Sequence, residues 1–192
     1  MVDPLEAAWE VHRILTEMGI PYVVIGGIAV QCWGEPRFTR DVDVTVLAPL
    51  GEEEDVIRRI LAAFKPRIGD ALEFALRNRV CLVEVRGTAV DISLGLPGYE
   101  EEVMRRAIAY NVGGGRTVQV CSPEDLVVHK AVAGRPQDIQ DIEGVVLRQG
   151  DKLDVEYIRK WLREFSFVLE EPEISERFER VWKKFVEDRE AR

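Results

Sequence analysis

The chain alternates between stretches whose apolar residues recur at helical spacing and shorter stretches that are continuously or alternately apolar. The first pattern predicts amphipathic helices and the second predicts strands. Two helices have a clear start, because Asp3 and Ser122 are each followed by proline in the order that caps a helix. Helices are therefore expected over residues 3–18, 28–33, 51–64, 99–106, 122–133, 137–149, 154–169 and 173–190. Strands are expected over residues 22–25, 42–47, 80–85, 89–94, 107–112 and 116–120, with another around Leu72–Leu76.

The stretch Val23–Val46 combines two strands with a glycine turn and reads V-V-I-G-G-I-A-V-Q-C-W-G-E-P-R-F-T-R-D-V-D-V-T-V. Gly26-Gly27 lies between an apolar strand and a short apolar helix. Glycine lets the backbone approach a ligand closely, and a helix N-terminus offers free N–H groups and the positive end of a dipole. This turn is therefore a candidate phosphate-binding site.

The second strand of that stretch carries Asp41 and Asp43, which point to the same face because alternate residues of a strand do so. Val42 and Val44 are then expected to point into the core. Two nearby carboxylates repel each other unless a cation lies between them, and Mg²⁺ is commonly held by one or two carboxylates together with substrate phosphates. An Asp-x-Asp pattern also occurs on ordinary surface strands, so the pair is informative mainly because the glycine turn precedes it.

Gly26-Gly27, thirteen intervening residues and Asp41-Val42-Asp43 together resemble the signature of the nucleotidyltransferase fold, the DNA polymerase beta-like superfamily. The loop ending Arg37-Phe38-Thr39-Arg40 further resembles the small bacterial nucleotidyltransferases of the abortive-infection toxin type (AbiEii-like). The resemblance covers roughly residues 20–145 and implies an α+β fold, with a mixed β-sheet nucleotidyltransferase core and flanking helices. With the helices expected farther along the chain, we predict a nucleotidyltransferase core in residues 1–121 and a C-terminal helical extension, packed on that core, in residues 122–192.

A third acid, Asp91, lies between Val90 and Ile92 on an expected strand. A carboxylate among buried residues needs a partner. In the nucleotidyltransferase fold a third carboxylate comes from a strand beside the Asp-x-Asp strand, and Asp91 corresponds to it by order and context. Glu84, on the preceding strand, is the competing candidate. The alternative for Asp91 is a solvent-facing acid on an edge strand.

The segment His129–Ile142 resembles the Lys-x4-Arg-x2-Asp-x2-Asp signature of the same toxin-type enzymes. In this resemblance Lys130 faces the triphosphate. Lys130, Arg135, Asp138 and Asp141 are also expected to form an ion-pair cluster that docks the helices beneath the site. The alternative is that these four residues form a solvated helix face.

The composition narrows the classes of function. A formal net charge of −9 argues against broad, non-specific nucleic-acid binding, while it leaves room for a local basic cleft or a basic protein partner. No apolar run is long enough for a membrane span, and the N-terminal segment lacks the pattern of an export signal. Cys32, Cys81 and Cys121 have the pattern of buried free thiols, which favours a cytoplasmic location.

These features predict a metal-dependent nucleotidyltransferase, an enzyme that moves a nucleoside monophosphate from a nucleoside triphosphate to an acceptor. The expected catalytic and metal-binding residues, which would hold Mg²⁺ or Mn²⁺, are Asp41, Asp43 and Asp91. The expected nucleotide-binding residues are Gly26, Gly27, Thr39, Arg40 and Lys130.

The acceptor and the biological role stay open at this stage. The resemblance implies a tRNA end, a protein side chain or a small hydroxylated molecule as acceptor, and a role in a toxin–antitoxin system with a cognate partner protein. The runner-up is a protein of the same fold that acts as a binding partner in a two-protein system with little or no turnover. A third possibility, a purely structural α/β domain, holds only if Asp91 points away from Asp41 and Asp43.

Overall fold

The computed structural model describes residues 3–190, and within them the chain forms two compact units. The first unit contains residues 3–28 and 38–121, and the second contains residues 29–37 and 122–190. The chain therefore passes between the units after residues 28, 37 and 121. The sequence places a division only at the last of these positions.

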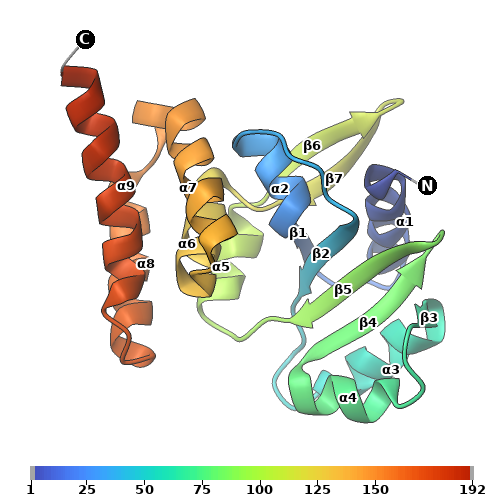
Figure 1. Ribbon diagram of the computed structural model, residues 1–192. Helices are drawn as coiled ribbons and strands as arrows, with labels where there is room; N and C mark the ends of the chain where they lie inside the picture. Colours follow the sequence, from blue (N-terminus) through green and yellow to red (C-terminus); the bar gives the residue numbers. More distant parts are fainter. Residues whose placement is uncertain (1–2, 191–192) are drawn as a thin grey trace. The chain divides into compact units, whose positions relative to one another are not determined.

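The first unit is built on a seven-stranded mixed sheet with the strand order β3-β4-β5-β2-β1-β7-β6 (Figure 1). The strands are β1 (Tyr22–Ile25), β2 (Asp41–Val46), β3 (Lys65–Pro66), β4 (Val80–Val85), β5 (Thr88–Leu94), β6 (Ile108–Gly113) and β7 (Arg116–Val120). β2 is parallel to β5 and β1 is parallel to β7, whereas the other neighbours are antiparallel. The two predicted hairpins, β4–β5 and β6–β7, are both present. This mixed sheet with its helices confirms the expected α+β class.

Among the described residues, the helices of the first unit are α1 (Pro4–Glu17), α3 (Glu53–Ala63), α4 (Ala71–Asn78) and α5 (Tyr99–Arg105). The helix α1 begins as predicted, because the carboxylate of Asp3 accepts a hydrogen bond from the N–H of Leu5 at 3.0 Å. Gly19 follows its end with a φ of +67°, the left-handed conformation that commonly terminates a helix. α1 packs against β2, β4 and β5.

The stretch around Leu72–Leu76 is a helix, and the expected strand is wrong. The helix α4 buries Ala71 and Ala75, which are four positions apart and so lie on one helix face. The segment A-L-E-F-A-L-R-N contains no β-branched residue, and alanine, leucine, glutamate and arginine are all strong helix formers. The helix propensity of these residues therefore outweighs the short alternating apolar pattern that suggested a strand.

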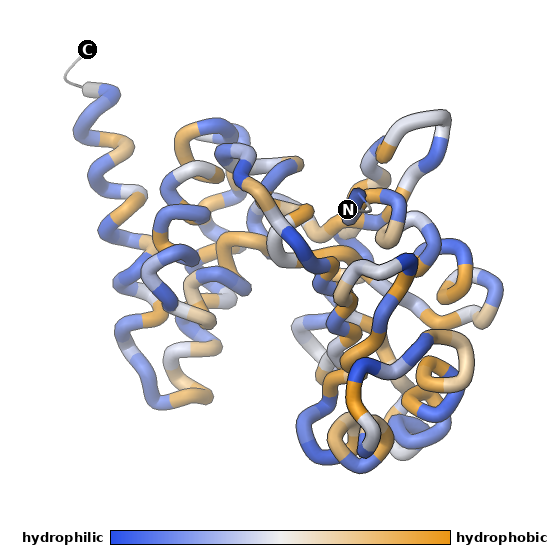
Figure 2. The backbone as a smooth tube through the Cα atoms, turned by 45° about the vertical axis from the view of Figure 1, so that its right-hand side comes forward, coloured by the Kyte–Doolittle hydropathy of each residue, from blue (hydrophilic) through white to orange (hydrophobic). Residues whose placement is uncertain are grey.

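The central strands of the sheet separate a buried face from an open face. On β2, Val42 and Val44 are fully buried, whereas Asp41 is exposed and Asp43 is half-buried. The strand β5 follows the same alternation, with Asp91 on its more exposed side. Figure 2 shows hydrophobic and hydrophilic residues mixed along the whole backbone. The acids of the predicted site consequently stand on the open face.

The second unit consists of helices. It contains most of α2 (Gly26–Trp33), together with α6 (Pro123–Ala133), α7 (Pro136–Gln149), the short 3-10 turn Gly150–Lys152, α8 (Val155–Val168) and α9 (Glu173–Glu190). The helix α6 starts at its predicted cap, where Oγ of Ser122 accepts a hydrogen bond from the N–H of Asp125 at 3.1 Å. It ends at Gly134, whose φ is +64°.

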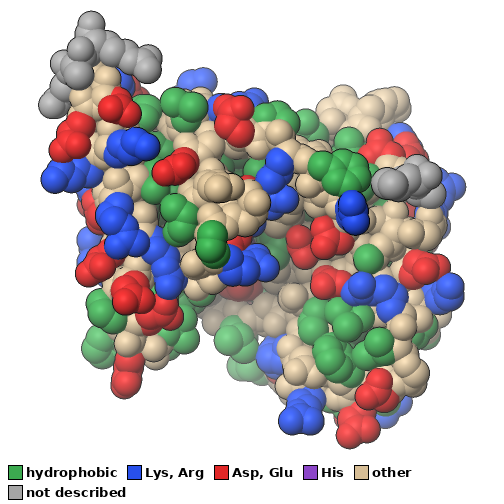
Figure 3. All heavy atoms as spheres, in the orientation of Figure 1, with side chains coloured by type: hydrophobic (Ala, Val, Ile, Leu, Met, Phe, Trp, Pro, Cys, Tyr) green, Lys and Arg blue, Asp and Glu red, His purple; other side chains and the backbone are tan. Residues whose placement is uncertain are grey.

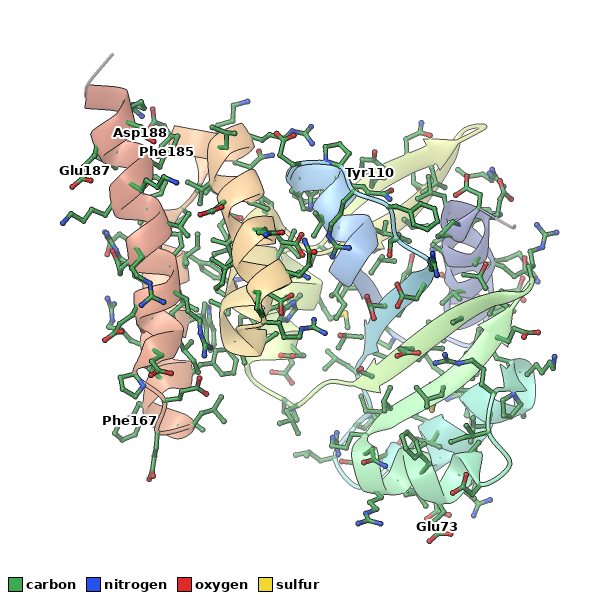
Figure 4. The ribbon with its side chains drawn as sticks, viewed as in Figure 1. Glu73, Tyr110, Phe167, Phe185, Glu187 and Asp188 are labelled. Carbon is green, nitrogen blue, oxygen red and sulfur yellow. The ribbon has the colours of Figure 1, made fainter. Side chains whose placement is uncertain are left out.

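The helix α9 carries an apolar stripe that belongs largely to the core of this second unit. The stripe consists of Ile174, Phe178, Val181, Trp182 and Phe185. Ile174 and Phe178 are fully buried, and α9 packs against α6, α7 and α8. Figure 4 shows Phe185 and Asp188 projecting from α9 on the side of α7, while Glu187 projects on the opposite side. Phe185 and Asp188 line a pocket between these two helices. The stripe therefore forms a helix–helix seam over most of its length.

Two simpler expectations can be checked directly. The three cysteines, Cys32, Cys81 and Cys121, are buried and lie outside any disulfide, as predicted. Within residues 3–190, no helix combines the length and the apolar character that crossing a bilayer requires.

Candidate active site

The glycine turn joins β1 directly to α2, with Gly26 as the first helical residue. Gly26 has a φ of +62°, a conformation that residues with a Cβ rarely adopt. A Cβ added at Gly26 would lie 1.9 Å from Oδ2 of Asp43, and one added at Gly27 would lie 2.3 Å from Oγ1 of Thr39. Both positions require glycine because Asp43 and Thr39 pack directly against the start of α2.

Asp43 lies beside the turn because β1 and β2 are antiparallel, with Ile25 opposite Asp43. Ile25 immediately precedes Gly26, so the carboxylate stands next to the first turn of α2. The N–H groups of a first helical turn have no partner within the helix, and proteins commonly bind phosphate there. A divalent cation can therefore bridge this carboxylate and a phosphate that is bound at the helix N-terminus.

Asp91 lies beside Asp43 on the neighbouring strand. The strands β2 and β5 are parallel, and their register places Asp43 opposite Asp91. Opposite residues of adjacent strands project from the same face of a sheet, so both acids stand on the open face. Glu84, the competing candidate, is one strand farther away, opposite Ala89, and its carboxylate is 2.9 Å from Nζ of Lys65. The register therefore favours Asp91 over Glu84 as the third acid.

Thr39 and Arg40 precede the acid-bearing strand and differ in their surroundings. Thr39 is buried, and its hydroxyl donates a hydrogen bond to Oδ1 of Asp41 at 3.0 Å. Arg40 is exposed, and its guanidinium carbon lies 5.7 Å from the centre of the Phe38 ring. Thr39 thus orients one of the acids, while a phosphate-binding role for Arg40 stays a prediction.

Lys130, on α6, belongs to a buried ion-pair cluster of the second unit. Its Nζ lies 2.8 Å from Oδ1 of Asp138 and 2.8 Å from Oδ2 of Asp141, and all three side chains are nearly inaccessible to water. Arg37 donates two hydrogen bonds to Asp141, at 2.8 and 3.0 Å, and Arg135 donates one from Nε to Asp138 at 2.7 Å. The ion-pair cluster that the sequence suggests for these helices is therefore present. The ammonium of Lys130 is thus already paired with two carboxylates. Its contact with a triphosphate stays a prediction.

The two aspartates of this cluster are held in the ionised form. Burial alone would raise the pKa of Asp138, but hydrogen bonds and charges from Arg135 and Lys130 outweigh it and leave the pKa below its ordinary value. The same balance, with Arg37 and Lys130 as partners, lowers the pKa of Asp141. Carboxylates that stay ionised when buried need such partners, so the cluster acts as a structural unit.

Arg67 is a residue of the site that the sequence reasoning missed. Its guanidinium donates from Nη2 to Oδ1 of Asp91. Arg67 follows the two-residue strand β3, and its N–H donates to the carbonyl of Leu82 at 3.0 Å. The only signal in the sequence was indirect, namely that an acid on a largely buried strand needs a cationic partner. Which of the many arginines would supply it depends on tertiary structure.

The fit of a divalent cation rests on Asp41 and Asp43. Within residues 3–190, no group of three or more His, Cys, Asp or Glu side chains is already arranged to hold a metal ion. Two carboxylates together with substrate phosphates are nevertheless a common set of oxygen ligands for Mg²⁺. Gly26 leaves the space beside Oδ2 of Asp43 that any Cβ would fill. The donor set thus fits a cation that arrives with a phosphate, whereas Asp91 is engaged by Arg67.

The surface of the first unit carries both acidic and basic side chains around the candidate site. Acidic side chains gather over β2 and β5, and basic side chains stand among them (Figure 3). A face that carries both signs can bind an anion through a bridging cation, and it is less suited to binding long stretches of nucleic acid.

A comparison with protein-family models gives the decisive observation. Residues 6–190 match a family described as "Nucleotidyltransferase of unknown function" (DUF6036). The chain belongs to this family. The match covers nearly the whole chain, and it includes the glycine turn, the three acids of the sheet and the helices of the second unit. A comparison with curated protein sequences finds no significant match.

Solved structures with a similar fold include a nucleotidyltransferase-like protein. An antigenic nucleotidyltransferase-like protein from Paracoccidioides brasiliensis aligns over 91% of this chain and 91% of its own, with 15% identity and a TM-score of 0.52. The antibiotic-resistance factor ANT(2'')-Ia aligns over 86% of this chain and 93% of its own in its solution structure, with 18% identity and a TM-score of 0.53. The crystal structure of ANT(2'')-Ia in complex with adenylyl-2''-tobramycin aligns over 84% of this chain and 98% of its own, with 19% identity and a TM-score of 0.52.

At these identities the likeness shows the fold alone. Together with the family it confirms the nucleotidyltransferase part of the resemblance seen in the sequence. Neither comparison shows the abortive-infection toxin subtype. The roles of the individual site residues remain predictions.

Proposed function

We propose that this protein transfers a nucleoside monophosphate from a nucleoside triphosphate to an acceptor hydroxyl, with Asp41, Asp43 and Asp91 as its catalytic acids. One observation carries the proposal: the register of β2 and β5 places Asp43 opposite Asp91, while Asp43 packs against the glycine turn at the start of α2. A phosphate-binding helix end and two acids on one sheet face are the parts that nucleotidyl transfer needs.

Different groups of the first unit would bind the phosphates and the cation. The N–H groups of Gly26, Gly27 and the following turn would hold the β- and γ-phosphates of the triphosphate. Asp41 and Asp43 would hold Mg²⁺ or Mn²⁺, which when bound stabilises the negative charge that develops on the phosphates. Thr39, hydrogen-bonded to Asp41, would keep that carboxylate turned toward its ligand.

Asp91 is farther from the glycine turn than Asp43 and would serve the acceptor. An acceptor oxygen forms a new bond to the α-phosphorus, the bond from the α-phosphorus to the bridging oxygen breaks, and pyrophosphate leaves with that electron pair. Asp91 would also help to hold the divalent cation, and the proton of the acceptor hydroxyl passes to its carboxylate, which acts as general base. Arg40 would add a positive charge near the leaving group.

The fold supports testing a small polyhydroxylated acceptor first. One structure of similar fold is an antibiotic-resistance factor, and it has been solved with an adenylylated tobramycin. A tRNA end and a protein hydroxyl are the other acceptor classes that the sequence suggests. A toxin–antitoxin role with a cognate partner protein gains no further support from the fold.

Intact-mass spectrometry tests the proposal. The protein is incubated with MgCl₂ or MnCl₂, all four triphosphates and representatives of the three acceptor classes. The expected result is that one acceptor gains the mass of a nucleoside monophosphate, and that Asp43→Asn abolishes this gain without lowering thermal stability. The matched control is Asp70→Asn, which changes an exposed acid before α4 and should leave transfer intact. Full activity of the Asp43→Asn variant would refute the assignment.

A specific observation also favours a second candidate, a nucleotidyltransferase-fold binding partner with little or no turnover. Asp91 is engaged by Arg67, and the part of the chain that the structure describes holds no ready-made metal cluster. The two candidates differ in nucleotide binding. A thermal shift that needs both a triphosphate and a divalent cation supports the enzyme, and the absence of any such shift supports the binding partner.

A further inference from the structure

The ion pair between Arg67 and Asp91 lies within the proposed site. Oδ1 of Asp91 accepts a hydrogen bond from the guanidinium of Arg67, and Asp91 is the register partner of Asp43. One lone-pair direction of this carboxylate is therefore already used by a positive charge. A cation that approached Asp91 would have to displace that charge or be repelled by it.

The backbone fixes where Arg67 stands. The N–H of Arg67 donates to the carbonyl of Leu82 at 3.0 Å, and Leu82 is opposite Asp91 across β4 and β5. The guanidinium is thus directed onto Asp91 from the adjacent edge of the sheet. The side chains of the pair remain 30% and 38% exposed, and ion pairs that are open to water contribute little net stability. Little free energy is therefore needed for another cation to replace the guanidinium of Arg67 at Asp91.

We propose that Arg67 is a positioning residue that occupies Asp91 as an internal cation, so that Asp91 becomes available to a divalent metal ion only when the guanidinium is displaced. This inference rests on the proposed function. It predicts weak binding of a divalent cation by the free protein. It also predicts that a bound nucleotide strengthens cation binding, because the phosphates supply oxygen ligands beside Asp41 and Asp43.

A neighbouring ion pair provides the matched control. Lys65 lies on β3, two residues before Arg67, and its Nζ is 2.9 Å from Oε1 of Glu84. Glu84 is opposite Ala89 and not opposite an acid of the site. Lys65→Met therefore removes a nearby ion pair, in which the lysine is more exposed than Arg67, without removing a charge from Asp91.

Electron paramagnetic resonance of free Mn²⁺ measures cation binding without any need for turnover. The expected result is that Arg67→Met and Arg67→Gln each bind MnCl₂ about tenfold more tightly than the unmodified protein, since a repelling charge is gone. Lys65→Met should change the affinity by less than about twofold. Asp91→Asn in the Arg67→Met background should remove the gain. Circular dichroism melts confirm that each variant is folded.

The outcomes separate this inference from the proposed function. If the unmodified protein binds Mn²⁺ with a nonhydrolysable triphosphate but the Arg67 variants bind no more tightly than it does, the inference is overturned and the proposed function stands. If no variant binds Mn²⁺ even with the nucleotide, the proposed function is overturned and the inference falls with it.

Discussion

Gly26 and Asp43 approach each other so closely that a Cβ on the glycine would be 1.9 Å from an oxygen of the aspartate. This contact joins the two parts of the candidate site, the helix end and the acid-bearing strand. The contact also makes the site sensitive to the smallest possible substitution, since even a methyl group must push the carboxylate aside.

Gly26→Ala is expected to reduce nucleotidyl transfer by about a hundredfold, because a displacement of about 1 Å at a reacting group can cost that much. The matched control is Gly19→Ala. Gly19 has a similar φ of +67°, but a Cβ there would meet nothing within 4 Å. Both variants should lose roughly 1 kcal/mol of stability from the left-handed backbone. Equal activities in the two variants would contradict a role for the contact.

Thr39→Val is expected to lower transfer by roughly tenfold while it changes the free energy of unfolding by about 1 kcal/mol. Valine keeps the shape of threonine but loses the hydroxyl that donates to Asp41. Steady-state kinetics and urea unfolding measure the two effects. Thr45→Val, a change at another buried threonine that lies on β2 itself, serves as the comparison and should leave kcat unaltered.

Lys130→Met is expected to destabilise the protein by about 3 kcal/mol, because it leaves two buried carboxylates with one cation fewer. Asp138 and Asp141 both lie 2.8 Å from the ammonium. Urea unfolding of the variant tests this directly. A variant with unchanged stability but weakened triphosphate binding would instead favour the phosphate-facing role predicted from the sequence. Lys65→Met, at an exposed ion pair, should cost less than about 1 kcal/mol.

The pH dependence of stability should reveal His129. Loss of hydration lowers the pKa of its imidazole to about 4, from an ordinary value of 6.5. Between these two values the unfolded chain binds a proton that the folded chain does not bind. The free energy of unfolding should therefore fall as the pH drops from 6.5 toward 4, with a slope of at most about 1.4 kcal/mol per pH unit from this residue.

His129→Gln should flatten that part of the curve. Urea unfolding between pH 7.5 and pH 4.5 is the measurement, because Asp138 and Asp141 take up protons only at lower pH, where their pKa values lie below the ordinary 3.8. Parallel curves for the variant and the unmodified protein would show that His129 does not titrate differently on folding.

Local pattern explains most of what the sequence predicted. The strand, glycine turn, helix and second strand of residues 22–46 follow from short-range hydrophobic periodicity and from glycine at one turn. The caps at Asp3 and Ser122 are equally local, and the side chain of each accepts the expected backbone hydrogen bond. The exception is α4, where an alternating pattern suggested a strand but helix propensity prevailed.

Contacts between distant residues explain what the sequence could not supply. Arg67 and Asp91 are 24 positions apart, and Arg37 and Asp141 are 104 positions apart. Nothing in a single sequence says which of many arginines meets which carboxylate. The resemblance to a family signature placed Asp138 and Asp141 in an ion-pair cluster, but it did not show that Arg37 joins them.

The strand order has a consequence for how the protein is made. The acid-bearing strand β2 lies between β1, which precedes it in the chain, and β5, which ends at Leu94, while β1 is closed on its other side by β7, which ends at Val120. On the ribosome, β2 therefore has a bare edge until the hairpin that carries Asp91 has emerged. Exposed edges of this kind invite pairing with other chains. Nascent chains that end before Leu94 or Val120 are therefore the forms of the protein that most need a chaperone.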